Sequence, residues 1–350
     1  MTERLAVVLF NLGGPDSPAA IGPFLRNLFR DPAILRVPFF VRPLLARLIA
    51  SRRLAPATAN YQLLGGRSPL LELTNAQATA LAEALGGAEV QVFVAMRYWH
   101  PFSAEVARAV QAWQPDRVVL LPLYPQFSTT TTGSSLDDWR NTACNAGLVV
   151  ETRAICCYPR DAGFVGTTRA GIQRAWTEAR AALPAAVPLR LLFSAHGLPE
   201  TIVRRGDPYQ WQVEQTVAAV LAGWEGPVPE HRICYQSRAT PQKWLEPSTE
   251  QELEHAAADH VAVLVVPIAF VSEHSETLVE LDVEYRDLAG RLGVPGYFRA
   301  PAQNADAGFI AALAGLVREA LAGPPGLCAA GGARLCPGSF AGCPMREIAG

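Results

Sequence analysis

Five strand-like apolar runs, each followed by an amphipathic stretch, constrain the fold of this chain most strongly. The apolar runs cover residues 5–12, 90–96, 117–123, 188–194 and 261–269, and the helical stretches that follow them cover 18–30, 103–113, 134–146, 208–223 and 274–292. Nearly continuous runs of Val, Ile and Leu are typical of parallel strands buried on both faces. The alternation therefore predicts an α/β protein whose parallel sheets are covered by helices.

The length of the chain allows two such units. A chain of 350 residues is long enough for two ordinary domains. Residues 6–18 and 190–202 each lead from an apolar run through a polar residue to Gly and Pro, so the two halves resemble each other weakly. We expect an N-terminal domain over 1–182, a C-terminal domain over 183–322 and a cysteine-rich segment over 323–350. Ligands bind at the carboxyl ends of strands in such sheets, so two facing halves would line a cleft.

Charge and hydropathy exclude several classes of protein. The formal net charge of −2 argues against nucleic acid as a partner. No apolar segment approaches the roughly 18 residues of a membrane-spanning helix. The first strand-like run begins at Leu5, which leaves no room for a targeting peptide and makes the cytoplasm the expected location. The seven cysteines are an odd number in a large chain with no secretion signal, which argues against a disulfide framework.

A row of acidic residues follows the last apolar run. Glu276, Glu280 and Glu284 are spaced i, i+4 and i+8, and Glu273 and Asp287 extend the row on nearly the same helical face. A solvated acidic helix face is one interpretation. The row begins, however, at the end of a core strand and close to His274. Carboxylates beside an imidazole suit a divalent first-row metal that passes from site to site, and clustered acids raise one another's pKa, which suits proton removal.

One histidine directly follows the apolar run 188–194. In FSAHGLP (193–199), His196 stands among small residues at the end of the expected strand, where a cleft would expose it. A buried structural histidine is the alternative. Ser194 would share its face, but no G-x-S-x-G elbow supplies a hydrolase nucleophile. The glycines of NLGGP (11–15) match neither common phosphate-binding loop, so a tight turn is the simpler interpretation.

Several longer motifs resemble those of the ferrochelatases, which insert Fe²⁺ into protoporphyrin IX to make haem. They are NLGGPDSP (11–18), Met96-Arg97-Tyr98 with His100-Pro101, LYPQFSTTTTGSS (123–135 in part), FSAHGLP, Gln236-Ser237 and PIAFVSEHSETLVELDVEY (267–285). The resemblance runs in order from about residue 5 to residue 320. It implies two Rossmann-like domains, each a parallel sheet flanked by helices, with an active-site cleft between them. Chelation of coproporphyrin or of another tetrapyrrole with Co or Ni, and a non-catalytic haem or porphyrin carrier, remain alternatives.

The resemblance also implies roles for individual residues. His196 matches the active-site histidine and Glu276 the carboxylate opposite it, so these two are the expected catalytic pair. The expected metal-binding residues are His196, Glu276, His274, Glu280 and Glu284. The expected porphyrin-binding residues are Leu12 (where other members carry Met), Arg52, Arg53, Tyr61, Ser68, Arg97, Tyr98, Trp244 and Phe270.

Three cysteines lie close together near the C-terminus. Cys328, Cys336 and Cys343 are spaced C-x7-C-x6-C, which alone indicates no more than a tail with incidental thiols. Some ferrochelatases bind a [2Fe–2S] cluster through C-terminal cysteines and one internal cysteine, and thiolates are the ligands that such a cluster needs. The resemblance therefore implies a cluster here, with Cys157 as the internal ligand and Cys156 as the alternative. Cys144 and Cys234 are expected to be structural.

The segment from Phe24 to Arg53 carries seven arginines and a single acid, Asp31. Apolar residues, interspersed arginines and proline breaks suit a porphyrin-binding lip over about 24–53 that lies on a lipid surface, at the inner face of the membrane. A helix pair packed on the core with snorkelling arginines is the alternative. The sequence leaves the oligomeric state open, with a homodimer among the options.

Overall fold

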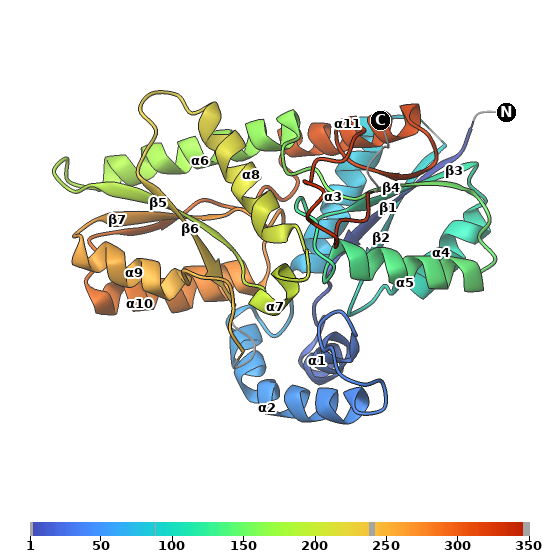
Figure 1. Cartoon of the computed structure of the whole chain (residues 1–350), viewed down its shortest axis with the longest axis horizontal. Helices are drawn as coiled ribbons and strands as arrows, with labels where there is room; N and C mark the ends of the chain where they lie inside the picture. Colours follow the sequence, from blue (N-terminus) through green and yellow to red (C-terminus); the bar gives the residue numbers. More distant parts are fainter. Residues whose placement is uncertain (1–2, 88, 238–241, 346–350) are drawn as a thin grey trace.

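The computed structural model describes residues 3–87, 89–237 and 242–345, and its strands form two separate sheets (Figure 1). The first sheet has the order β2-β1-β3-β4-β9 and the second the order β6-β5-β7-β8, with parallel pairing throughout. The strands are β1 (Leu5–Asn11), β2 (Val90–Met96), β3 (Arg117–Pro122), β4 (Glu151–Ile155), β5 (Leu189–His196), β6 (His231–Gln236), β7 (Ala262–Pro267), β8 (Tyr297–Arg299) and β9 (Gly326–Cys328). The prediction of an α/β protein with two parallel sheets is confirmed.

Helices connect the strands and cover the faces of both sheets. They are η1 (Pro18–Ala20), α1 (Ile21–Arg30), α2 (Arg42–Leu63), α3 (Leu70–Leu85), α4 (Ser103–Trp113), α5 (Thr132–Asn145), α6 (Ala162–Ala182), α7 (Glu200–Val203), α8 (Tyr209–Ala222), α9 (Thr249–Ala258), η2 (Glu276–Glu284), α10 (Tyr285–Leu292) and α11 (Ala307–Ala322). Four of the five helical stretches expected from the sequence form as 3₁₀ or α helices. The fifth, 274–292, begins as the π-helix η2 and continues as α10.

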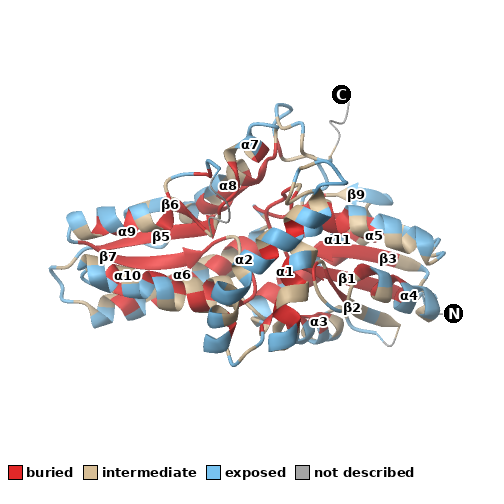
Figure 2. Cartoon of the chain, turned by 90° about the horizontal axis from the view of Figure 1, so that it is seen from below, coloured by how far each residue is buried: buried red, intermediate tan, exposed pale blue. Residues whose placement is uncertain are grey.

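Strand β1 shows why the strand sequences are mostly apolar. Leu5, Val7 and Leu9 face a core shared with α3 and α11, whereas Ala6, Val8 and Phe10 face α4 and α5. Side chains alternate between the two faces of a strand, so a strand covered on both faces carries apolar residues on both of them. The second sheet is built in the same way, with α6 and α8 on one face and α9 and α10 on the other, and its strands are buried between these layers (Figure 2).

The chain passes from one sheet to the other and then returns. The expected domain boundary at 182/183 falls between α6 and β5, but Ile172 and Ala175 of α6 already pack in the core of the second sheet. Helix α11, expected in the C-terminal domain, packs its Phe309 and Leu313 in the same continuous core beside α3 of the first sheet. Strand β9, from the expected C-terminal segment 323–350, pairs with β4 of the first sheet; residues 346–350 of that segment lie outside the described residues.

Helices α1 and α2, from the segment in which the lip is expected, lie together on one side of both sheets, and we refer to this helix pair as the lip (Figure 1). Ile21, Phe24 and Phe29 of α1 pack with Ala46 and Ala50 of α2 in a small core of their own. The opposite surface of α2 is largely exposed (Figure 2). Among the described residues, none of the helices combines the length and the apolar character needed to span a bilayer.

Candidate active site

The two expected catalytic residues face each other at the carboxyl ends of two neighbouring strands. His196 is the last residue of β5, and Glu276 begins η2, which follows β7; β5 and β7 pair directly. The imidazole Nδ1 of His196 lies 3.0 Å from Oε2 of Glu276. Both side chains remain partly accessible, with 37% of His196 and 27% of Glu276 exposed. The structure thus brings these two side chains together.

Glycine at position 197 allows the chain to turn tightly beside His196. A Cβ at this position would lie 2.8 Å from the carbonyl oxygen of Gln236 and 3.3 Å from Cε3 of Trp244. Trp244 also forms a bridge with Pro199 and is 8% exposed. The expected porphyrin-binding Trp244 therefore packs directly behind the backbone that carries His196.

The His196–Glu276 pair shifts the pKa of both partners. Burial alone would lower the pKa of His196, but the charge of Glu276 and the hydrogen bond to it raise that pKa above its ordinary value of 6.5. Burial alone would raise the pKa of Glu276, but His196, followed by His274, lowers that pKa well below its ordinary value of 4.5. Glu276 is thus held as an anion between two imidazoles.

Histidine 274 approaches the same carboxylate oxygen from the other side. Its Nε2 lies 3.6 Å from Oε2 of Glu276, and its Nδ1 lies 3.1 Å from the carbonyl oxygen of Ser272. Since a carbonyl can only accept, Nδ1 of His274 carries the proton. Nε2 therefore either donates its own proton to Glu276, as in the imidazolium, or turns a lone pair towards a cation held between the two side chains, as a metal ligand would.

Glu280 is the next acid in the row, and its carboxylate is fully occupied by protein donors. Its Oε1 accepts hydrogen bonds from the Ser237 backbone N–H at 2.8 Å and from the Tyr285 hydroxyl at 3.1 Å. Its Oε2 accepts from Gln236 Nε2 at 3.1 Å and from the Ser237 hydroxyl. Burial and then the charge of Glu276 raise the pKa of Glu280 above 4.5. The sequence did not lead us to assign Gln236, Ser237 and Tyr285 to the site.

The outer part of the acidic row differs from the expectation. Glu284 is exposed and accepts a hydrogen bond from Nδ2 of Asn60 in α2, 3.1 Å away. Asp287 is exposed on α10. Glu273 does not extend the row, because it precedes the helix and its Oε1 lies 2.8 Å from Nη1 of Arg299 and accepts from the backbone N–H of Ala302. The continuous row is therefore Glu276, Glu280 and Glu284.

Two aromatic residues border the His196–Glu276 pair. The ring of Phe270 lies 6.4 Å from that of His196 and 4.8 Å from that of His274, measured between ring centroids. The hydroxyl of Tyr61, in α2, accepts a hydrogen bond of 3.5 Å from Ser275. Burial and the nearby charge of Glu276 raise the pKa of Tyr61 to about 12, against a weaker lowering by Ser275. The lip therefore touches the start of η2.

The other expected porphyrin contacts of the first domain lie around the turn after β1. A Cβ at Gly14 would lie 2.5 Å from the Ser68 side chain, so Ser68 packs closely on that turn. Leu12 accepts a backbone hydrogen bond of 3.0 Å from Tyr98 and packs in the same small core as Tyr61. Leu12, Ser68 and Tyr61 are therefore near neighbours.

Arg97 and Tyr98 are bound to a buried acid. Nη2 of Arg97 lies 2.9 Å from Oδ2 of Asp31, and the Tyr98 hydroxyl donates to the same oxygen at 2.8 Å. Ser134 donates to this oxygen too and accepts from Arg97 Nε at 2.7 Å. Asp31 and Tyr98 are 4% and 1% exposed, so this network anchors the lip to the first sheet. Of the remaining expected contacts, Arg52 is exposed and Arg53 half-buried on α2.

Five cysteines, including all four expected cluster ligands, lie around the junction of β4, β9 and α8. Nε2 of Gln212 donates hydrogen bonds to Sγ of Cys336 at 3.0 Å and to Sγ of Cys157 at 3.5 Å. Sγ of Cys156 lies 3.3 Å from Sγ of Cys157. A hydrogen bond from Cys336 lowers the pKa of Cys343 to about 6, and burial raises the pKa of Cys328, in β9, to about 11.

The remaining two cysteines, Cys144 and Cys234, lie outside this group. Cys144 is exposed on α5, and Cys234 is buried in β6. Across the residues that the structure describes, no set of three or more His, Cys, Asp or Glu side chains is arranged as a ready-made metal site.

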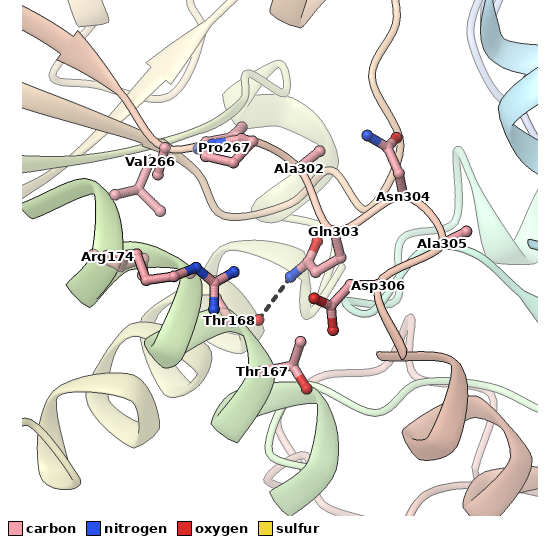
Figure 3. Close-up of a pocket in the computed structure, with 14 residues that line it drawn as sticks. Thr167, Thr168, Arg174, Val266, Pro267, Ala302, Gln303, Asn304, Ala305 and Asp306 are labelled. Atoms are coloured by element: carbon pink, nitrogen blue, oxygen red, sulfur yellow. Dashed lines mark hydrogen bonds between the residues drawn. The ribbon is translucent and has the colours of Figure 1, made fainter. Parts of the chain in front are cut away.

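A cavity of about 410 Å³ lies apart from His196 and Glu276, between α6 and the loop before α11 (Figure 3). Thr167, Arg174, Gln303 and Asp306 contribute its polar lining. Nε2 of Gln303 donates to the Thr168 hydroxyl at 2.7 Å. Neither the acidic row nor the cysteines line this cavity, so it is not part of the candidate active site.

Comparisons of the sequence with known proteins point to one family. The ferrochelatase family profile matches residues 4–321. A ferrochelatase of Caulobacter vibrioides (strain NA1000 / CB15N) is 50% identical over 351 residues, which cover 99% of each chain. Ferrochelatases of Hyphomonas neptunium and Rickettsia bellii are 50% and 41% identical, over 99% of this chain and 96% and 98% of theirs.

Comparisons with solved structures support the fold alone. The sirohydrochlorin chelatase SirB from Bacillus subtilis subspecies spizizenii, in complex with cobalt, matches with a TM-score of 0.53 at 12% identity, over 91% of this chain and 95% of that one. SirB from Bacillus subtilis with Fe³⁺ matches over the same shares, with a TM-score of 0.51 at 11% identity. The family profile and the close relatives, which span nearly the whole chain, show that the chain belongs to the ferrochelatase family and is a metal chelatase, a lyase.

Proposed function

We propose that this ferrochelatase inserts Fe²⁺ into protoporphyrin IX and releases the two inner pyrrole protons. The observation that carries the proposal is the His196–Glu276 pair, with Nδ1 of the imidazole 3.0 Å from the carboxylate. Because Nδ1 faces Glu276, Nε2 is the nitrogen left to take a proton from a substrate. A base and an adjacent row of oxygen ligands are the two features that metallation of a porphyrin requires.

His196 acts as the proton acceptor in this proposal. A neutral imidazole takes a pyrrole proton on Nε2, and the Glu276 carboxylate stabilises the imidazolium that forms. The raised pKa of His196 makes it a stronger base than free histidine. The proton then leaves to solvent, His196 is neutral again and the second pyrrole proton follows the same route.

Glu276 and His274 present Fe²⁺ as a substrate. Oε2 of Glu276 and Nε2 of His274 lie 3.6 Å apart and both offer lone pairs, so a divalent cation can replace a proton between them. Glu280 and Glu284 continue outward to the exposed end of η2. Few ligands make a weak and exchangeable site, which favours transfer of the metal to the porphyrin.

The aromatic and apolar residues around the pair would hold the macrocycle. Phe270, Trp244 and Tyr61 lie beside or behind the pair, and Leu12 and Ser68 lie at the turn that Tyr61 packs against. We propose that their contacts bend the porphyrin so that its nitrogen lone pairs point out of the ring plane. Arg52 and Arg53 would bind its propionates, with Arg97 and Tyr98 at the far face.

Metal insertion with defined porphyrins tests the function. Anaerobic assays with Fe²⁺, Co²⁺ and Ni²⁺, each with protoporphyrin IX and with coproporphyrin III, should show the highest kcat/KM for Fe²⁺ with protoporphyrin IX. His196→Ala should lower kcat by at least about 100-fold, the contribution typical of a general base. The matched control is His255→Ala, since His255 is an exposed histidine on α9. Full activity of His196→Ala would refute the base assignment, and a preference for coproporphyrin would change the substrate.

We also propose that Cys157, Cys328, Cys336 and Cys343 hold a [2Fe–2S] cluster. The donor set fits, because the group consists of thiols and Gln212 donates hydrogen bonds to two of the sulfurs, which would stabilise thiolate charge. When bound, such a cluster can accept and donate one electron. Its iron–sulfur bonds would also link the C-terminal segment to the end of β4. Absorption and EPR spectra of anaerobically purified protein test it. Cys157→Ser should abolish the signal, whereas loss in Cys156→Ser alone would assign the fourth ligand to Cys156.

The exposed surface of the lip supports a peripheral contact with the membrane. Phe39, Phe40 and Leu44 are 79%, 71% and 74% exposed, which is unusual for such large apolar side chains. We propose that they enter the interface of a lipid bilayer, from which an apolar porphyrin could reach the site. Flotation with vesicles should show binding that Phe39→Ser with Phe40→Ser removes.

A further inference from the structure

A second cavity, of about 450 Å³, lies within the lip and is lined by three arginines. Arg26 and Arg30 project from successive turns of α1, and Arg47 from the second turn of α2; Pro43 and Ala46 complete the lining. Five residues from two packed helices thus form one pocket, and three of the five carry a full positive charge.

The positive charge of this pocket is not neutralised by the protein. Asp31, the single acid between Phe24 and Arg53, is 4% exposed and directed at Arg97, Tyr98 and Ser134. Within the described residues, Arg26, Arg30 and Arg47 have neither an acidic partner nor a hydrogen bond from their guanidinium groups. Three uncompensated guanidinium groups around one cavity attract an anion.

Other arginines of the lip differ in this respect. Arg42 donates to the carbonyl oxygens of Leu35 and Val37, at 3.1 and 3.0 Å, and so holds the loop before α2. Arg36 donates to the Thr129 hydroxyl at 3.3 Å. Exposed Arg52 has no such contact among the described residues either, but it does not line the pocket, so Arg26, Arg30 and Arg47 are distinguished by sharing one cavity.

Large exposed apolar residues lie next to the pocket. Leu44 and Leu48 are 74% and 46% exposed and follow Pro43 and Arg47 directly in sequence, so they lie on the adjoining face of α2. Phe39 and Phe40 precede the same helix. A ligand that fills the pocket with an anionic group would thus meet an apolar surface at its rim.

We propose that this pocket binds the phosphate of an anionic phospholipid headgroup, with the acyl chains along Leu44 and Leu48. Arginine pairs with phosphate oxygens through two parallel hydrogen bonds, and three guanidinium groups can share one phosphodiester. The N-terminus of α2, which begins at the pocket, adds positive potential. The proposal rests on the proposed membrane contact and extends it, because the pocket would select the class of lipid.

Calorimetric titration with soluble short-chain lipids tests the site. Dihexanoyl phosphatidylglycerol, below its micellar concentration, should bind at one site per chain, at least tenfold more tightly than dihexanoyl phosphatidylcholine or inorganic phosphate. Arg30→Gln and Arg47→Gln should each weaken binding of phosphatidylglycerol about fivefold. Arg108→Gln, on the exposed face of α4, removes the same charge far from the lip and should leave binding unchanged.

Lysine variants separate the pocket from diffuse attraction. Arg30→Lys and Arg47→Lys keep the charge but lose the planar guanidinium group that binds a phosphate through two hydrogen bonds. If the pocket binds the lipid, both variants should therefore bind it more weakly than the wild type. Equal binding of the lysine variants and the wild type would overturn the proposal. Tighter binding of inorganic phosphate than of the lipid would overturn it as well, because the site would then serve free anions.

Two further measurements distinguish the lipid-binding proposal from the proposed metal insertion and the proposed membrane contact. Metal insertion with detergent-solubilised porphyrin should be unchanged in Arg30→Gln; a raised porphyrin KM would assign the pocket to the substrate's propionates and overturn the lipid proposal. Vesicles of phosphatidylcholine with and without phosphatidylglycerol report on the membrane contact itself. Phe39→Ser with Phe40→Ser should reduce binding to both kinds of vesicle, whereas Arg30→Gln should remove only the preference for phosphatidylglycerol.

Discussion

At the scale of single residues, one carboxylate oxygen organises the candidate active site. Oε2 of Glu276 lies 3.0 Å from Nδ1 of His196 and 3.6 Å from Nε2 of His274. In the proposed mechanism, the same atom serves both halves of the chemistry: it would stabilise the imidazolium that His196 forms, and it would offer a lone pair to a metal beside His274. Competition between proton and metal for this oxygen would link metal binding to proton release.

Replacing Glu276 should change the titration of His196. In metal-free Glu276→Gln, the pKa of His196 should fall, because the charge that raises it is gone and burial then lowers it. NMR titration of the imidazole C–H signals measures the shift. Glu284→Gln removes the same charge at the exposed end of η2 and should leave the pKa of His196 nearly unchanged; an equal shift in both variants would contradict the pairing.

The pKa shifts of His196 and Glu276 predict the pH range in which their interaction stabilises the fold. The folded-state pKa of His196 is raised. Its contribution to the free energy of unfolding is therefore fully present below about pH 6.5 and is lost as pH rises through the folded-state pKa. The folded-state pKa of Glu276 is lowered. Its contribution to the free energy of unfolding is therefore fully present above about pH 4.5 and is lost as pH falls. The difference in unfolding free energy between the wild type and Glu276→Gln should therefore be largest between these values, at about 1 kcal/mol for so accessible a pair. Urea unfolding at a series of pH values tests this, and a difference that grows above pH 8 would contradict it.

At the scale of elements, the π-helix η2 sets the geometry of the acidic row. The spacing of Glu276, Glu280 and Glu284 predicts a helix but does not distinguish α from π. Gln236 of β6 donates to the carbonyl oxygen of Glu276 at 3.0 Å, and the Tyr297 hydroxyl of β8 donates to that of Leu281 at 2.7 Å. These two hydrogen bonds tie η2 to strands on both sides of it.

Arg299 should be essential for holding this element in place. Its guanidinium binds both oxygens of Asp282 in η2 at 2.7 Å, and Glu273 before η2 at 2.8 Å. Arg299→Met leaves two poorly accessible carboxylates without their partner and should destabilise the protein by about 3 kcal/mol. Arg140→Met, which breaks an exposed pair with Asp137, should cost less than about 1 kcal/mol. Chemical unfolding midpoints measure both, and similar losses would show that Arg299 is no anchor.

At the scale of the whole molecule, the strands with a strongly apolar sequence could be predicted, whereas the strands without a clear apolar pattern could not. Strands β1, β3, β5 and β7 carry runs of aliphatic residues that are buried on both faces, and β2 carries a similar run of which only the last three residues are buried. Strand β6 reads HRICYQ and strand β9 has three residues, so neither has a pattern of its own, and their pairing partners define them. Because β6 was not expected, its terminal Gln236 and the following Ser237 were not assigned to the site, although they bind Glu280. His196 and Glu276 were accessible to sequence reasoning, because His196 ends one apolar strand and Glu276 begins the helix that follows another.

The C-terminal segment depends on a distant glycine. Gly206, after α7, has φ +91°, and a Cβ there would lie 2.7 Å from the backbone nitrogen of Ala341; its carbonyl accepts from Gly342 at 2.9 Å. Gly206→Ala should therefore displace the tail and expose Cys336, which is 5% exposed. Gly226 has φ +86° and no neighbouring atom within 4 Å of the position that a Cβ would take, so Gly226→Ala imposes a similar backbone cost of about 1 kcal/mol without the clash.

Thiol labelling of reduced, chelator-treated protein distinguishes the two glycine variants. Cys336 should react at least tenfold faster with a maleimide in Gly206→Ala than in the wild type, with Gly226→Ala close to the wild type, as peptide mass spectrometry can show. The tail is also held by the Phe340 ring, which lies 5.7 Å from that of Trp211 in α8. Unchanged protection in Gly206→Ala would mean that this aromatic contact and the Gln212–Cys336 hydrogen bond hold the segment without the glycine. The link between the tail and the second sheet would then lie in α8 alone, and the loop after α7 would take no part in it.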